Sequence, residues 1–324
     1  MSPVTGLHHV SVISGPAQET LDFYVAGLGM RLVKRTVNQD APDTYHLFFA
    51  DGAGTPGTEL TFFPWPGMPA GRPGHGLTTE VALAVPADSL DFWADRLAAL
   101  GIAAGACTVR FGEPTLTFAD PHGLRVALVA TGDARAFTPW DASPVPAEYQ
   151  VRGLHAVRLD ARAAGPTARF LDAALGHTAV AAEDGPDGRW TRYAAGGAGG
   201  SGRFVDVRET PDAQRGMWGV GSVHHVAFRV PDDAAERDAQ QAVRAAGAHP
   251  TDVIDRFWFK SVYFREPGGA LFELATDGPG FAVDEDPAAL GERLVLPPFL
   301  EPRRAEIERG LPPVHTPRPT PAGV

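Results

Sequence analysis

The chain has 324 residues, of which 44% are hydrophobic, and its 28 basic and 39 acidic side chains give a formal net charge of −11 at pH 7. This charge argues against nucleic acid and anionic membrane surfaces as partners. Cys107 is the only cysteine, which excludes an internal disulfide and a zinc site built on several thiolates. The chain starts without the basic segment and apolar run of a signal peptide, and it contains no run of 18 apolar residues. We therefore expect a soluble, cytoplasmic protein.

Four segments of the chain begin alike, with GLHHVSV at Gly6, GLTTEVAL at Gly76, GLHAVRL at Gly153 and SVHHVAF at Ser222. Their starts are 70, 77 and 69 residues apart. Each start alternates in the manner of a half-buried strand. Each is followed by a stretch with apolar residues at intervals of three and four that ends in glycine. This pattern predicts amphipathic helices at residues 17–29, 89–101, 166–176 and 232–247.

Short strand-like runs follow each predicted helix, so that the order strand, helix, three strands recurs four times. In the first copy these runs cover residues 31–37, 45–50 and 58–64, and in the fourth 248–255, 260–266 and 270–276.

A Pro-rich joint near residue 150, PWDASPVPAEYQ, divides the chain into two halves. We expect an N-terminal domain at 6–140, with modules at about 6–67 and 76–132, and a C-terminal domain at 150–277, with modules at about 152–210 and 222–277. A Pro-rich tail, 278–324, follows. We expect one short helix within 298–313 and disorder in the last dozen residues.

This fourfold repeat resembles the vicinal-oxygen-chelate superfamily, which comprises glyoxalases, extradiol ring-cleaving dioxygenases and drug-sequestering resistance proteins. The resemblance covers residues 6 to about 277. It implies an α+β fold in which four tandem βαβββ modules form two open β-barrels, with a divalent metal inside a barrel. Because a fold alone does not fix the chemistry, the metal ligands must decide between these activities.

The histidine pairs in the first and fourth copies supply the first candidate ligands. Adjacent strand residues point to opposite faces, so only one histidine of each pair can enter a barrel. His8 and His224 share their faces with Val and Phe residues, which are typical of a face packed under a helix. His9 and His225 share a mixed face of small and polar residues, and we predict that they point inward. The third copy has Ala156 at this position.

The last strand of the fourth copy supplies a carboxylate. Aligned on their glycines, the last strands of the four copies place together Thr61, Ala127, Asp206 and Glu273. Glu273 lies within the apolar run LFELA, and a buried, unpaired carboxylate is costly unless a partner such as a metal ion is present. Thr61 is a poor ligand. Two histidines and one carboxylate with open coordination positions suit non-haem Fe(II), with Mn(II) as an alternative metal.

Several motifs resemble one branch of the superfamily, the hydroquinone-type ring-cleaving dioxygenases. They are LHHVSV, VKRT, YHLFFAD, GTPGTELTFFP, VHHVAF, DRFWFKSVYFREPGG and LFELAT. In this branch the iron ligands come from a far N-terminal histidine and two C-terminal residues. The resemblance implies cleavage of a hydroquinone ring by O₂, with the iron ligands His9, His225 and Glu273. It also implies second-sphere or substrate-binding roles for His8, His224, Arg256 and Tyr263.

Other interpretations stay open at this point. His8 and His224 could be core histidines bonded to backbone carbonyls, Arg256 a surface ion pair and Tyr263 a packed ring. A catechol-type extradiol dioxygenase would have the same iron site. A glyoxalase-like isomerase or hydrolase usually needs a fuller ligand set, and a drug-sequestering protein typically lacks the metal triad. The predicted partners are a small aromatic diol and O₂, and a homo-oligomer is left open.

Overall fold

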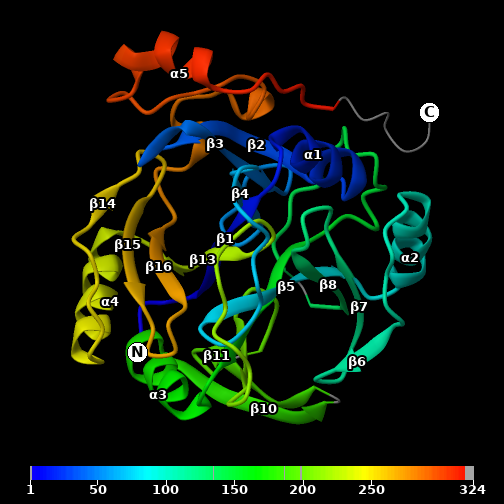
Figure 1. Cartoon of the computed structure of the whole chain (residues 1–324), viewed down its shortest axis with the longest axis vertical. Coiled ribbons are helices and arrows are strands. Elements are labelled where there is room, and N and C mark those ends of the chain that lie inside the picture. Colours follow the sequence, from blue (N-terminus) through cyan, green and yellow to red (C-terminus); the bar gives the residue numbers. More distant parts are fainter. Residues whose placement is uncertain (1, 134, 186, 198, 318–324) are drawn as a thin grey trace.

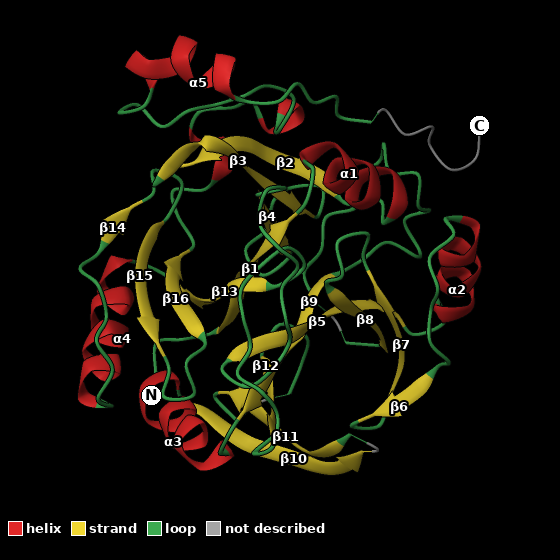
Figure 2. Ribbon diagram, in the orientation of Figure 1, coloured by secondary structure: helices red, strands yellow, loops and turns green. Residues whose placement is uncertain are grey.

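Two curled sheets of eight strands each make up most of the protein in the computed structural model, which describes residues 2–133, 135–185, 187–197 and 199–317. Figure 1 shows the two sheets side by side, and Figure 2 shows that α2 and α4 lie on their outer sides. The predicted order of strand, helix and three strands recurs in all four units, so the predicted α+β fold of two open barrels is confirmed. No helix in the described ranges has the length and apolar character needed to cross a membrane.

The first sheet contains the first and fourth units, in the strand order β14-β15-β16-β13-β1-β4-β3-β2. The first unit comprises β1 (Gly6–Ser14), α1 (Ala17–Leu21), its π-helical continuation η1 (Asp22–Gly27), β2 (Arg31–Asn38), β3 (Ala41–Ala50) and β4 (Glu59–Pro64). The fourth comprises β13 (Val223–Val230), α4 (Asp233–Ala245), β14 (Ile254–Asp255), β15 (Lys260–Arg265) and β16 (Leu271–Thr276).

The second sheet contains the second and third units, in the order β10-β11-β12-β9-β5-β8-β7-β6. The second unit comprises β5 (Leu77–Pro86), α2 (Leu90–Ala99), β6 (Thr108–Arg110), β7 (Glu113–Ala119) and β8 (Arg125–Thr131). The third comprises β9 (Gly153–Ala161), α3 (Ala164–Leu175), β10 (His177–Gly185), β11 (Gly188–Ala195) and β12 (Phe204–Glu209).

The two sheets cut across the expected division into halves at 6–140 and 150–277. Each sheet takes one unit from each half, because β1 pairs antiparallel with β13 and β5 pairs antiparallel with β9. These pairings supply hydrogen-bond partners for backbone N–H and C=O groups that would otherwise be unpaired at the edge of each unit's sheet. All four first strands have similar patterns, so the sequence does not reveal which two will pair. As a result, the two ends of the repeat region meet in one sheet.

Local sequence signals account for most element boundaries. The helix α3 ends at Gly176, whose φ of 64° lies in the left-handed region that glycine adopts at low cost. The helix α4 begins after Asp232, whose carboxylate accepts hydrogen bonds from two backbone N–H groups of the first turn. The predicted strand at 248–255 is reduced to the two residues of β14. Pro250 within this run has no N–H to donate to a neighbouring strand.

The tail packs back onto the first sheet and contains the expected short helix, α5 (Arg304–Gly310). Three 3₁₀ turns precede α5, namely η2 (Phe281–Val283), η3 (Pro287–Ala289) and η4 (Glu301–Arg303). The fully buried Lys34 of β2 anchors this segment through ion pairs with Asp284 and Glu285. Disorder of the last dozen residues is wrong for His315, whose N–H donates to Gln18 Oε1 at 2.8 Å. Residues 318–324 lie outside the described residues.

Candidate metal centre

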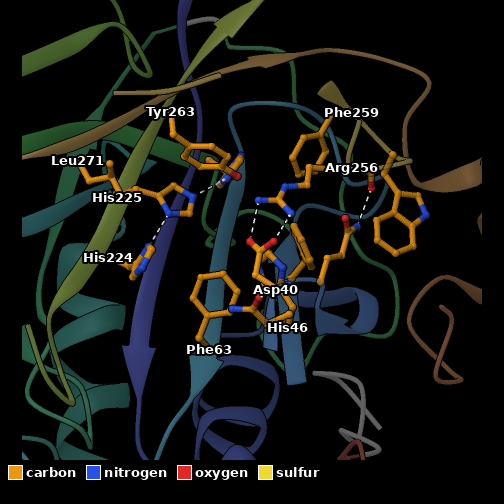
Figure 3. A pocket seen from close by; sticks show the side chains of 14 residues that line it. Asp40, His46, Phe63, His224, His225, Arg256, Phe259, Tyr263 and Leu271 are labelled. Carbon is orange, nitrogen blue, oxygen red and sulfur yellow. Dashed lines mark hydrogen bonds and ion pairs between the residues drawn. The ribbon is translucent and has the colours of Figure 1, made fainter. Parts of the chain in front are cut away.

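The candidate site lies in a cavity of about 210 Å³ within the first sheet. Figure 3 shows its side chains, which come from both ends of the chain. The lining residues from the first unit are His9, Asn38, Gln39, Asp40, His46, Phe48 and Phe63, and those from the fourth are His224, His225, Arg256, Trp258, Phe259, Tyr263 and Leu271. The cavity therefore has aromatic walls with polar groups at a few points, as small-molecule sites commonly do.

His9, His225 and Glu273 converge at this cavity, as the sequence predicted. The Nε2 atoms of His9 and His225 lie 3.3 Å apart. Oε2 of Glu273 lies 3.3 Å from Nε2 of His9 and 2.9 Å from Nε2 of His225. Three ligand atoms bound to one ion at about 2.1 Å, with right angles between the bonds, would lie about 3.0 Å apart. The three side chains thus have the spacing of one face of an octahedron.

The hydrogen bonding around Glu273 also fits a cation. Glu273 is fully buried, and its Oε2 accepts no hydrogen bond from the described residues although two imidazoles are adjacent. Its other oxygen, Oε1, accepts a hydrogen bond from Ser261 Oγ at 2.5 Å. Burial opposes ionisation of Glu273, but the neighbouring His9 and His225 outweigh it and hold the pKa of the carboxyl well below its usual range. An ionised oxygen without a hydrogen bond, beside two imidazole nitrogens that face each other at 3.3 Å, forms a donor set suited to a divalent metal.

Two irregularities in the pairing of β1 with β13 determine where His8 and His224 lie. Leu7 pairs with Phe228 and His9 pairs with Ala227, so His8 is an extra residue in β1. Ser11 pairs with His225 and Val12 pairs with Val223, so His224 is an extra residue in β13. A bulge of this kind re-aims a side chain and is frequent beside active sites. The expectation that strict alternation would place His8 and His224 on the face packed under the helices is therefore wrong.

His8 and His224 each contact the ligand histidine that follows them. The Nδ1 atoms of His8 and His9 lie 2.9 Å apart, and those of His224 and His225 lie 2.8 Å apart. Burial, followed by the adjacent histidine, lowers the pKa of both His8 and His224 to about 3, so both are neutral at pH 7. A neutral acceptor at Nδ1 of His9 and of His225 keeps the proton there and leaves Nε2 with a lone pair that could bind a metal.

Arg256 and Tyr263 also line the cavity. Both guanidinium nitrogens Nη1 and Nη2 of Arg256 bond the carboxylate of Asp40, at 3.2 and 2.8 Å. The guanidinium lies 5.5 Å from the centre of the Tyr263 ring, which itself contacts the ring of His225. Burial, and then the charge of Glu273, raises the pKa of Tyr263, so its hydroxyl remains protonated at pH 7. The backbone at Phe257 has φ of 74°, a strained value for a bulky residue, in the loop that presents Arg256.

His46 is among the cavity residues that escaped the sequence reasoning. His46 of β3 stacks between Phe48 and Phe63, with ring centroids 3.9 and 4.3 Å away. Its Nε2 is 2.9 Å from Oγ1 of Thr61, which in turn is 2.7 Å from Oγ of Ser11. Thr61 therefore takes part in a hydrogen-bonded chain at the position where the fourth unit has the candidate ligand Glu273. A polar residue inside the apolar run YHLFFA was a signal that could have identified His46.

The interior of the second sheet provides a comparison. Asp206 occupies the position of Glu273 there, but Arg192 bonds both of its oxygens, at 2.8 and 3.0 Å. Arg192 also bonds Glu113 at 2.7 Å, and Glu113 lies 3.0 Å from Nε2 of His155. The space left among these ion pairs is about 10 Å³, too small for a substrate. Within the described ranges, both groups of residues with metal-binding geometry belong to the first sheet.

Known proteins resemble this chain over nearly its whole length. It is 40% identical to a Bacillus subtilis protein provisionally named ring-cleaving dioxygenase MhqA, over 96% of this chain and 99% of the relative. It is 35% identical to a chlorohydroquinone/hydroquinone 1,2-dioxygenase of Sphingobium indicum, over 94% of this chain and 95% of the relative.

Solved structures agree with these relationships. A crystal structure of a provisionally assigned dioxygenase from Bacillus subtilis superposes with a TM-score of 0.91 at 40% identity, covering 98% of this chain and all of that one. Glyoxalase I from Zea mays has the same fold, with a TM-score of 0.62 at 17% identity over 84% of this chain and 92% of that one. The model of one family matches residues 6–128 and 154–274. The chain therefore belongs to the Glyoxalase/Bleomycin resistance protein/Dioxygenase superfamily, as its repeats and motifs predicted.

Proposed function

We propose that this protein is an Fe(II)-dependent ring-cleaving dioxygenase that opens hydroquinone or a substituted hydroquinone with O₂. The observation that carries the proposal is the convergence of His9, His225 and Glu273 at one end of an aromatic cavity. A set of two histidines and one carboxylate leaves room on the metal for a substrate and O₂ together. The relative named chlorohydroquinone/hydroquinone 1,2-dioxygenase supports the choice of a 1,4-diol over a catechol.

The alternatives receive less support. Thr61 is engaged with Ser11 and His46, which disfavours the fuller ligand set of a glyoxalase-like isomerase. A drug-sequestering protein would have no need of three buried ligands spaced for one ion. An ordinary catechol enzyme of this superfamily takes its first histidine from the third unit, where this chain has Ala156 in a closed interior. A catechol enzyme here would therefore have to use His9, His225 and Glu273 instead.

Each side chain in the cavity has a role under this proposal. His9, His225 and Glu273 hold the metal, and a bound Fe(II) supplies a Lewis acid and a route for electrons from the diol to O₂. His8 and His224 fix the tautomers of the two ligand histidines through their Nδ1 contacts.

The polar groups of the wall act on the diol. Arg256, held by Asp40, stabilises negative charge that develops on the substrate. Tyr263 keeps its hydroxyl proton and orients the ring beside the metal ligands. Phe63 and Phe259 exclude water and pack against the aromatic ring.

The test is O₂ consumption by the protein after anaerobic loading with Fe(II). We expect uptake with methylhydroquinone, weaker uptake with catechol, and a ring-opened acid that contains both atoms of ¹⁸O₂. Treatment with a chelator should abolish the activity, and Fe(II) should restore it; loading with Mn(II) in parallel compares the two metals. A fully Fe(II)-loaded protein that consumes no O₂ with either diol would disprove the proposed function.

A further inference from the structure

The first and fourth units occupy equivalent positions in the two halves of the first sheet, so each residue of one unit can be compared with its counterpart in the other. This comparison identifies the counterpart of His46. In the first unit, Thr61 of β4 pairs with Ser11 of β1. In the fourth unit, Glu273 of β16 pairs with Ala227 of β13, so Thr61 and Glu273 occupy equivalent positions. On the neighbouring strands, Phe48 lies opposite Thr61 and Tyr263 lies opposite Glu273.

It follows that His46, two residues before Phe48, corresponds to Ser261, two residues before Tyr263. Ser261 bonds the metal ligand Glu273, whereas His46 bonds the non-ligand Thr61. In this half of the site the carboxylate is missing, and an imidazole stands where the other half has a small hydroxyl. His46 therefore lies in the half of the site that supplies no carboxylate, and it lines the same cavity as His9 and His225.

The packing around His46 fixes its orientation and its charge. Its ring is tilted by 38° to both Phe48 and Phe63, and it lines the cavity wall. Burial, followed by the neighbouring His9, lowers its pKa well below the ordinary value, so the imidazole is neutral. A neutral imidazole has one N–H donor and one acceptor nitrogen.

The hydrogen-bonded chain determines which nitrogen carries the proton. If His46 donated to Thr61 and Thr61 to Ser11, the Ser11 proton would have no acceptor among the described residues. If Ser11 donates to Thr61 and Thr61 donates to Nε2 of His46, each hydroxyl proton has an acceptor. Buried hydroxyls rarely leave a donor unused, so the second direction is favoured. It places the imidazole proton on Nδ1, which has no hydrogen-bond partner among the described residues.

We infer that His46 is a substrate-binding residue whose Nδ1–H donates a hydrogen bond to the diol oxygen remote from the metal. The inference rests on the proposed function, because it assigns one oxygen of a 1,4-diol to the metal triad. The second oxygen of such a diol cannot reach the same ion and needs a donor on the wall. Arg256 directs its two terminal nitrogens at Asp40 and contributes positive charge, whereas Nδ1 of His46 has no hydrogen-bond partner among the described residues and can make this contact. In Figure 3, His46 and Phe63 lie on one side of the pocket and Tyr263 on the other.

Anaerobic binding of two ligands to the Fe(II)-loaded protein tests the inference. Hydroquinone has the remote oxygen and phenol lacks it, so the two ligands differ only in the atom that His46 is expected to bind. The variant His46→Phe keeps an aromatic ring between Phe48 and Phe63 but has no donor. The variant His46→Asn loses the ring but carries an amide N–H near the place of Nδ1. Isothermal titration measures each Kd, and iron content and thermal unfolding confirm that each variant is loaded and folded.

We expect His46→Phe to weaken hydroquinone binding about tenfold, the effect of losing one hydrogen bond to a buried group, and phenol binding by less than about twofold. His46→Asn should retain hydroquinone affinity within about threefold of the unchanged protein. If His46→Phe does not fold, His46→Leu serves as the donor-free variant. Unchanged hydroquinone affinity in the donor-free variant, or an equal loss for phenol, overturns the inference alone. An unchanged protein that binds no hydroquinone overturns both the inference and the proposed function.

Discussion

The Nε2 atoms of His9 and His225 lie 3.3 Å apart, although 216 residues separate the two histidines in the chain. The antiparallel pairing of β1 with β13 brings them together, with Ser11 opposite His225 and His9 opposite Ala227. Each unit thus contributes its histidine from the same strand position. The candidate metal centre therefore depends on the meeting of the first and fourth units.

Replacement of one ligand should abolish metal binding. We expect His9→Ala to lower Fe(II) affinity by more than about 100-fold, beyond the loss typical of an outer-shell partner, because only His225 and Glu273 remain. Competition with a chromophoric chelator measures this affinity. His155→Ala is the control for the loss of a buried histidine, since His155 lies in β9 of the second sheet, at the position of His8 and His224, and does not line the cavity. A His9→Ala protein with unchanged iron affinity would contradict the assignment.

The histidines that precede the ligands should affect metal affinity less strongly. His8→Ala removes the acceptor for Nδ1 of His9, so the ring loses its fixed tautomer and orientation. We expect roughly a 10- to 100-fold loss of Fe(II) affinity. His8→Asn, which restores an acceptor, should recover part of this loss in the same chelator assay. If alanine and asparagine at this position behave alike, the hydrogen bond to His9 has no role in metal binding.

The chain has only two lysines, and they should differ in their contribution to stability. Lys34 is fully buried against Asp284 and Glu285, with its ammonium 5.0 Å from the centre of the Trp258 ring. Lys34→Met leaves the buried Glu285 unpaired, and we expect the free energy of unfolding to fall by about 3–5 kcal/mol.

Lys260→Met is the control, because Lys260 pairs with Asp233 at the surface. We expect a much smaller loss there, because solvent screens this exposed ion pair. Urea unfolding followed by circular dichroism measures both changes, and the double variant Lys34→Met/Glu285→Gln should recover part of the stability. Equal losses at the two lysines would disprove the anchoring role of Lys34.

A buried carboxyl on α4 should make stability depend on pH. Burial, and then the charge of Asp233, raises the pKa of Glu236 to about 7, and its Oε1 has no hydrogen bond among the described residues. Below pH 4.5 both the folded and the unfolded chain hold this proton. As the pH rises from 4.5 to 7, the unfolded chain loses it first, so the folded state is progressively destabilised.

Glu236→Gln removes this penalty. Its stability relative to the unchanged protein should increase between pH 5 and pH 8, by at most about 3 kcal/mol. Urea unfolding at the two pH values measures the difference. Asp238→Asn, at an exposed carboxylate of the same helix, is the control for the change in net charge. A Glu236→Gln advantage that does not vary with pH would contradict the assignment.

Much of the site followed from local patterns. The alternation of faces in β1 and β13 identified His9 and His225, and a carboxylate within the apolar LFELA run identified Glu273. The three side chains do converge in the structure, because the period of a strand is fixed by backbone geometry. The same rule was wrong for His8 and His224, because each lies at a bulge where one strand has an extra residue. A bulge depends on the partner strand and therefore leaves no reliable mark on its own segment.

The sequence by itself determined the repeated units, the helices and strands within them, and the residue types available for a metal. Only the tertiary structure decided that the first unit pairs with the fourth, that the second and third close over their own ion pairs, and that His46 joins the cavity wall. The physical reason is that the first strands of all four units carry almost the same apolar pattern. Which of them pair is decided by the packing of whole units, and that packing also brings the ligands from the two chain ends to one point.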